Sequence, residues 1–193
     1  MNMQSYLIEF QSKAALQDFL AAGPLPYLVL GYDSEAPREF YAVDIWGRLG
    51  KPYRIGIISS GSGIRPSLVH SSDREYWAIG YHSRIGIVDA DNACLISETC
   101  LDGVFFEFII CDSNDEFVAV HELGAAKFRF SGAKVCSIST DILESWRKDP
   151  GDKLILRQQE DGKEIVVDLK DCTGPADCRA ADLHDNGDSY NAQ

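Results

Sequence analysis

Two stretches of the sequence decide the fold class: WAIGYHSRIGIVD at residues 77–89 and FVAVHELGAAKFRF at residues 117–130. Each reads as a short strand, a tight turn and a second strand, and their first residues, Trp77 and Phe117, stand 40 positions apart. A third stretch, LILRQQEDGKEIVVDL at residues 154–169, has the same form. Short runs rich in Val, Ile, Phe and Tyr between turn residues are typical of antiparallel β-hairpins.

The same pattern extends outward from these stretches. Further strand-like runs at 27–31, 39–45 and 53–59 are separated by Gly, Pro, Asn and Asp clusters, which favour turns. The sequence therefore predicts a mainly β fold, with antiparallel hairpins in a sandwich or an incomplete propeller-like array. One N-terminal helix is expected at about 13–22, because Ser12 can cap it and Gly23-Pro24 can end it.

The sequence divides into one β-rich domain at 1–170 and an acidic C-terminal tail at 171–193. The tail is rich in Asp, Ala, Gly and Asn and contains few residues that could be buried. A second, short helical turn is expected at Asp141–Trp146, with Thr140 or Asp141 as its cap.

The interval near 40 residues, observed over about 76–170, is that of a four-stranded propeller blade. In its strand, turn and strand ending in Asp, this region resembles the blades of WD40-like and quinoprotein-type propellers. The Gly-His and Trp-Asp signatures of those blades are absent, and the chain is too short for four complete blades. The resemblance therefore implies an incomplete array; successive hairpins that look periodic without being blades are the alternative.

The distribution of apolar and basic residues indicates in which cellular compartment the protein is expected. No apolar run approaches the roughly 20 residues that a membrane-spanning helix needs. The first ten residues lack the basic start and apolar stretch of a signal peptide, so we expect a cytoplasmic protein. Its six cysteines are then expected to be reduced, with Cys111 and Cys136 buried in strands. A Cys172–Cys178 disulfide remains open as an alternative for an oxidising setting.

The net charge of −12 is unevenly distributed along the chain. Residues 85–126 contain nine Asp and Glu and neither Lys nor Arg, whereas residues 1–84 sum to zero and residues 127–170 sum to +1. Such a segment favours one negative face, which either aids solubility or docks a basic protein. For docking, we predict contacts from Glu98, Asp102, Glu107, Asp112, Asp115, Glu116 and Glu122. The same charge would repel nucleic acid.

No motif in the sequence defines a catalytic site, a cofactor or a metal centre. The four histidines are not paired with a recognised motif, and the Ser-Gly loop at 59–63 lacks the Lys and the helix of a phosphate loop. The cysteine pairs are spaced more widely than zinc knuckles. Oxygen ligands alternate at 89–92 and at 112–116, as in calcium loops, but the Gly and distant Glu of an EF-hand are missing. We expect no cofactor and no metal.

The leading hypothesis is a non-catalytic protein-binding protein with a basic partner. In size and acidity the chain resembles the bacterial toxin-immunity proteins, which implies neutralisation of a basic, nuclease-type toxin through the acidic face. The alternatives are a scaffold or peptide-binding β-domain and, third, a hydrolase of small substrates. The sequence does not distinguish between oligomeric states.

Overall fold

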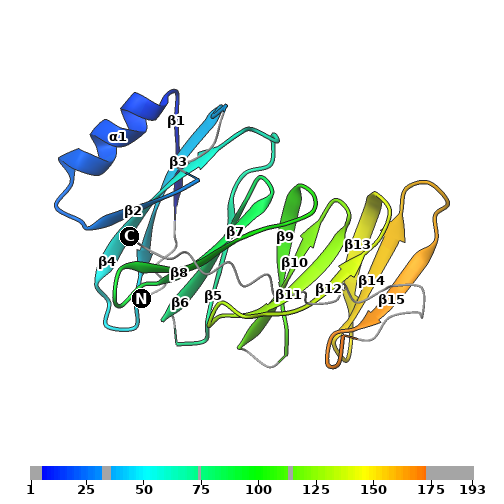
Figure 1. The fold of residues 1–193 in the computed structure, drawn as a ribbon. Coiled ribbons are helices and arrows are strands. Elements are labelled where there is room, and N and C mark those ends of the chain that lie inside the picture. The colour runs from blue at the N-terminus through cyan, green and yellow to red at the C-terminus, as the bar shows by residue number, and fades with distance from the viewer. Residues whose placement is uncertain (1–5, 32–35, 74, 113–114, 173–193) are drawn as a thin grey trace, which may run out of the picture.

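The computed structural model describes residues 6–31, 36–73, 75–112 and 115–172. Within these ranges the chain forms fifteen strands and one helix. The strands make four separate sheets, which stand side by side in one row with the helix at one end (Figure 1). This arrangement confirms the predicted mainly β fold of antiparallel hairpins with one N-terminal helix.

The first sheet has the strand order β1-β3-β4-β2 and carries the helix. Its strands are β1 (Leu7–Phe10), β2 (Tyr27–Leu30), β3 (Glu39–Trp46) and β4 (Pro52–Ser59), and the helix α1 spans Lys13–Ala22. The side chain of Ser12 caps α1 by accepting a hydrogen bond from the Ala15 amide at 3.2 Å. Leu16 and Leu20 of α1 are buried against this sheet, which fixes the helix on one of its faces.

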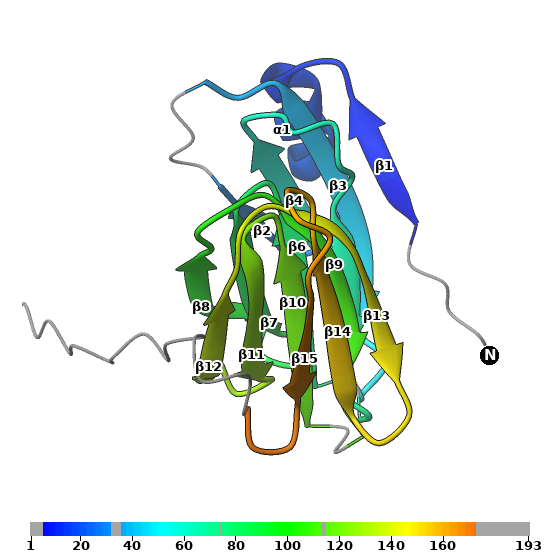
Figure 2. The ribbon, with the colours of Figure 1, turned by 90° about the vertical axis from the view of Figure 1, so that its right-hand side faces the viewer.

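The other three sheets are antiparallel meanders whose strands follow one another in chain order. The second sheet contains β5 (Ser67–His70), β6 (Tyr76–Tyr81), β7 (Arg84–Asp89) and β8 (Cys94–Cys100). The third contains β9 (Phe105–Ile110), β10 (Glu116–His121), β11 (Gly124–Arg129) and β12 (Lys134–Ser139), and the fourth contains β13 (Leu143–Asp149), β14 (Lys153–Gln158) and β15 (Glu164–Asp168). Viewed from the fourth sheet, β8 and β12 lie on one side of the row and β13 on the other (Figure 2).

Equivalent backbone hydrogen bonds recur in the last three sheets. The amides of Ala90, Phe130 and Leu169 donate to the carbonyls of residues 75, 115 and 152 over 2.8, 3.1 and 2.7 Å. The three donors follow one another at intervals of 40 and 39 positions. The interval in the sequence thus corresponds to a structural unit of consecutive hairpins, and the third unit has three strands where the other two have four.

Three hydrophobic clusters lie between successive sheets and hold the row together. One joins the first and second sheets, one the second and third, and one the third and fourth. The sheets approach closely where a strand carries glycine: a Cβ on Gly80 of β6 would lie 2.3 Å from the Phe105 ring of β9. Burial of these apolar faces is the main driving force for stacking the sheets.

The helical turn expected at Asp141–Trp146 is wrong. Leu143–Asp149 forms strand β13, in which Trp146 pairs with Leu156 of β14 and stacks on Phe106 of β9 with ring centroids 4.9 Å apart. Pairing with β14 and packing on the third sheet override the local capping signal, since helix propensity is a weak prior.

The cysteines also differ from the expectation. Cys136 of β12 forms a disulfide with Cys172, which follows β15, over a sequence separation of 36. The prediction that these two cysteines are reduced is therefore wrong, and Cys172 is not paired with Cys178, which lies outside the described residues. The two cysteines pair because the third and fourth sheets lie next to each other, and the spacing of cysteines along the sequence does not predict this contact. Cys111 is buried as predicted, although it lies just after β9, and burial raises the pKa of its thiol to about 11. Cys136 lies in strand β12 as predicted but is only half-buried.

Among the described residues, no helix has both the length and the apolar character that crossing a bilayer requires. Most of the acidic tail, residues 173–193, lies outside the described part of the chain.

Candidate binding site

The turns of the last three sheets lie alternately at the two ends of the strands, and so along the two long sides of the row, because neighbouring strands are antiparallel (Figure 1). One end of the strands carries the turns at 82–83, 101–104, 122–123, 140–142 and 159–163. The other carries the described residues 71–73, 75, 90–93, 111–112, 115, 130–133 and 150–152. We call the first the pocket end and the second the opposite end.

Backbone hydrogen bonds join neighbouring turns across the pocket end. The Glu122 amide donates to the Val104 carbonyl at 2.8 Å, and the Glu122 carbonyl accepts from the Leu143 amide at 2.9 Å. The Gln159 amide donates to the Ile142 carbonyl at 2.8 Å. Turns from the second, third and fourth sheets are therefore fixed relative to one another, which gives this end a defined shape.

At the opposite end, two residues of the predicted docking face are paired with cations. Asp112 lies 2.7 Å from the Lys148 ammonium. Glu116 lies 2.6 Å from the Lys127 ammonium and 3.3 Å from the Arg129 guanidinium. The hydrogen bond from Lys127 is the main reason why the pKa of Glu116 is lowered. These cations lie outside residues 85–126, so the acidic segment is compensated through strand pairing and sheet packing.

Glu98 and Glu107 lie on strands and have partners of their own. Glu98 of β8 accepts a hydrogen bond from the Tyr81 hydroxyl and lies 3.3 Å from the Arg84 guanidinium. Glu107 of β9 accepts from the indole N–H of Trp146. Both carboxylates therefore take part in contacts that support the fold.

The remaining three predicted residues are divided between the two ends. Asp115 is exposed at the opposite end, and its carboxylate has no cation partner in the described part of the chain. Asp102 and Glu122 lie close together at the pocket end, where a Cβ on the intervening Gly103 would be 3.0 Å from the Cβ of Glu122. The structure thus brings Asp102 and Glu122 together and places Asp112, Asp115 and Glu116 at the other end.

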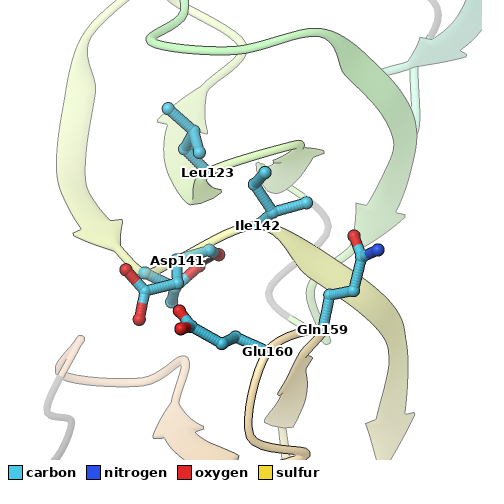
Figure 3. Close-up of a pocket in the computed structure, with 6 residues that line it drawn as sticks. Leu123, Asp141, Ile142, Gln159 and Glu160 are labelled. Carbon is cyan, nitrogen blue, oxygen red and sulfur yellow. Dashed lines mark hydrogen bonds between the residues drawn. The ribbon is translucent and has the colours of Figure 1, made fainter.

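Next to Glu122, the turns of the third and fourth sheets border an open pocket of about 630 Å³. It is lined by Leu123, Thr140, Asp141, Ile142, Gln159 and Glu160 (Figure 3). Leu123 and Ile142 give it an apolar wall, and Ile142 remains 47% exposed. In the view of Figure 3, the carboxyl groups of Asp141 and Glu160 point to the same side of the pocket.

The pocket end has an excess of negative charge. Asp102, Glu122, Asp141, Glu160 and Asp161 form no ion pair with any Lys or Arg of the described residues. The buried Gln158 orients one of them by donating from its amide to Asp141 at 3.3 Å. An apolar wall beside carboxylates that lack a cation suits a ligand with an apolar stem and a positive head.

The sequence did not single out Asp141 and Glu160. They lie in residues 127–170, where the acidic and basic residues nearly balance, and neither belongs to a motif. The balance is misleading because cations of this segment pair with carboxylates away from the pocket end: Lys127 with Glu116, and Lys148 with Asp112 and Asp152. Lys163 is the one Lys or Arg in the described turns of the pocket end. The sequence pattern marked Asp141 only as a possible helix cap and Glu160 only as the neighbour of the Asp161-Gly162 turn.

The histidines that the structure describes do not converge on a site. His70 packs on Trp77 with ring centroids 4.8 Å apart, and a ring nitrogen of His82 lies 3.0 Å from the Ser83 hydroxyl. His121 is only 2% exposed, and its Nδ1 has no hydrogen-bond partner within the described residues. Burial lowers the pKa of His121, which keeps its imidazole neutral near pH 7.

The other loops considered from the sequence have structural roles. The Asp89 carboxylate accepts from the amides of Asp91 and Asn92 at 2.9 and 2.8 Å and so stabilises its own turn. The Ser59 hydroxyl accepts from the Gly61 amide at 3.2 Å. Over the described ranges, no group of three or more His, Cys, Asp and Glu is placed to hold a metal ion.

Comparison with known proteins finds likeness in structure but none in sequence. No protein-family model matches the chain, and neither does any curated protein. Among solved structures, the chain is similar to hydrazine synthase of Kuenenia stuttgartiensis, with a TM-score of 0.50 and 13% identity over 79% of this chain and 49% of that one.

It is also similar to the dihydro-heme d1 dehydrogenase NirN in complex with DHE, with a TM-score of 0.51 and 13% identity over 72% of this chain and 34% of that one. Both are propeller-like, β-rich proteins, in agreement with the blade-like repeat. The chain spans half or less of the length of each, and at this identity the likeness shows the fold alone.

Proposed function

We propose that this chain is a non-catalytic protein-binding protein whose partner is a basic protein held at the pocket end. The observation that carries the proposal is the set of carboxylates at this end, Asp102, Glu122, Asp141, Glu160 and Asp161, which lack a cation partner among the described residues. Complementary charge speeds the encounter of two proteins and fixes their register. The apolar wall of the adjacent pocket supplies the desolvated contact that affinity also needs.

The proposal moves the docking surface away from the strand faces of residues 85–126. Glu116 and Asp112 already hold Lys127 and Lys148, so a partner would have to displace these intramolecular pairs to use them. At the pocket end no such exchange is needed. A binding surface formed by turns on a rigid row of sheets is also a common arrangement, since loops tolerate variation that the packed strands do not.

The narrower form of the proposal is an immunity function, in which the partner is a nuclease-type toxin domain. It rests on the size and acidity of the chain, and it requires a partner whose own surface is strongly positive. A toxin that acts on nucleic acid must carry such a surface, because phosphates dominate its substrate. An acidic protein of this size can cover that surface.

The test is capture from a lysate at low salt, followed by elution with a salt ramp and identification by mass spectrometry. Three baits are compared: the natural chain, the double variant D141K/E160K and the control D115K. Asp115 is an exposed carboxylate without a cation partner in the described chain, but it lies at the opposite end. Near-ultraviolet circular dichroism verifies that all three baits are folded.

We expect the natural chain and D115K to retain the same basic protein and D141K/E160K to lose it. With that partner in hand, stopped-flow measurements at low salt should give association on the order of tenfold slower for D141K/E160K. Equal capture by all three baits, or loss with D115K alone, would contradict docking at the pocket end. Capture only of neutral proteins would contradict the basic partner.

A further inference from the structure

The pocket between the third and fourth sheets is specific enough to name the group that enters it. We propose that it takes one arginine side chain of the partner protein, with its aliphatic stem on Leu123 and Ile142 and its guanidinium between Asp141 and Glu160. The inference rests on the proposed function and deepens it. The inference names the side chain that enters one pocket. The proposed function requires only that the pocket end as a whole is negatively charged.

The size and the apolar wall of the pocket fit a long side chain. The pocket of about 630 Å³ is open to solvent and has room for a long side chain. Leu123 and Ile142 line it, and Ile142 is 47% exposed without a partner chain. Lys and Arg bury their methylene stems against such surfaces while the charged head stays among polar groups.

The pocket offers hydrogen-bond acceptors to a cationic group. Asp141 and Glu160 offer carboxylate oxygens, whereas the amide of Gln159 points away from both of them (Figure 3). The amide of Gln158 donates to Oδ2 of Asp141, and the Asp141 carbonyl accepts from the Thr140 hydroxyl at 2.7 Å, so this residue is held at both side chain and backbone. Oδ1 of Asp141 accepts no hydrogen bond from the residues that the structure describes, so it is available to a ligand.

This acceptor set favours arginine over lysine. A guanidinium is planar, presents five N–H donors in a fixed fork and can bind two carboxylates at once. An ammonium has three donors and is more strongly hydrated, so it loses more on entering a pocket with an apolar wall. Two carboxylates on one side of the pocket therefore match the geometry of arginine better than a point charge (Figure 3).

The experiment uses the full chain and short blocked peptides as probes. Acetyl-Gly-Gly-Xaa-Gly-Gly-amide is titrated with Xaa as arginine, lysine or citrulline, the neutral isostere of arginine. Methyl NMR signals of Leu123 and Ile142 report on the pocket, and those of Leu95, which lies on the exposed strand β8, report on non-specific binding. The conservative variant D141N/E160Q is compared with the control D115N.

We expect the arginine peptide to shift the Leu123 and Ile142 methyl signals with millimolar affinity, at least fivefold tighter than the lysine peptide. Citrulline should cause no shift. D141N/E160Q should weaken arginine binding at least tenfold, and D115N should leave it unchanged. Equal binding of arginine and citrulline, equal binding of arginine and lysine, or the absence of pocket shifts would each overturn the inference.

The two proposals fail in different ways. Capture of a basic protein that is lost in D141K/E160K, without any response to the arginine peptide, would leave the protein-binding function standing and remove the arginine. If the arginine peptide shifted the methyl signals of Leu123 and Ile142 but the natural chain captured no basic protein, the arginine site would be supported and the proposed function would be wrong.

Discussion

The ammonium of Lys127 in β11 lies 2.6 Å from the carboxylate of Glu116 in the neighbouring strand β10, and the lysine side chain is only 4% exposed. The same ammonium donates to the carbonyl of Leu169 at 2.5 Å, beyond the end of β15. One cation therefore joins the third sheet to the last described segment of the chain. A buried charge is tolerated here because it is both paired and hydrogen-bonded.

Lys127→Met should destabilise the protein by about 3 kcal/mol, because it leaves the Glu116 carboxylate and the Leu169 carbonyl without their buried partner. The measurement is urea-induced unfolding of the natural chain and the variant. The double variant K127M/E116Q should recover part of the loss, because the Glu116 carboxylate, which Lys127→Met leaves with the exposed Arg129 as its cation, is then replaced by a neutral amide as well. If Lys127→Met unfolded at the same urea concentration as the natural chain, this pair would not contribute to joining the sheets.

Reduction of the Cys136–Cys172 disulfide should lower the stability of the fourth sheet. Opening a loop of 36 residues releases chain entropy in the unfolded state worth at most about 4 kcal/mol. The thermal midpoint should therefore fall in the presence of a reductant, and C136S should show the same fall without one. The control C94S/C100S, which removes two exposed free thiols, should respond to reductant as the natural chain does. An identical midpoint with and without reductant would show that the bond is absent or contributes nothing.

Stability should decrease as the pH falls below 6.5 because of His121. Burial lowers the pKa of this imidazole, with the charge of Asp102 opposing and that of Lys134 adding to the shift. Below the ordinary pKa of 6.5, the unfolded chain binds a proton that the folded chain does not, so unfolding is favoured until the pH reaches the lower, folded pKa. One proton limits the slope to about 1.4 kcal/mol per pH unit.

Urea unfolding at pH 7.5, 6.5 and 5.5 measures this slope. His121→Gln should flatten it, whereas His70→Gln, at an exposed position, should not. The carboxylates with lowered pKa, such as Glu116 and Asp152, have ordinary values of 4.5 and 3.8 and act mainly below this window. A slope in His121→Gln equal to that of the natural chain would assign the pH dependence to another group.

Gly80→Ala should destabilise the contact between the second and third sheets by about 2 kcal/mol, because the new methyl group would lie 2.3 Å from the Phe105 ring. The double variant G80A/F105L should recover part of this loss, and a double-mutant cycle measures the coupling. Gly23→Ala is the matched control, since its Cβ would meet only the movable guanidinium of Arg54. Additive effects of the two substitutions at 80 and 105 would contradict direct contact.

The sequence by itself determined most of the local structure of this protein, with the strand at Leu143–Asp149 as an exception. The cap at Ser12 and the stop at Gly23 predicted helix α1, and alternating runs with turn residues predicted the hairpins. These signals act over a few residues, through hydrogen bonds and backbone preferences that do not depend on the rest of the chain. The interval between Trp77 and Phe117 likewise anticipated units that the structure shows as consecutive sheets.

Only the tertiary structure decided which charged residues form ion pairs and which cysteines form a disulfide. Linear charge placed an uncompensated segment at 85–126, but Lys127 and Lys148 reach its carboxylates from other strands. The carboxylates of Asp141 and Glu160 became conspicuous once the turns of two sheets met around a pocket. Electrostatic pairing acts through space over a few ångströms, so sequence distance does not predict it. Of the nine carboxylates at 85–126, Asp102 and Glu122 lie at the pocket end, where the fold places them with Asp141, Glu160 and Asp161 from the segment whose charges nearly balance.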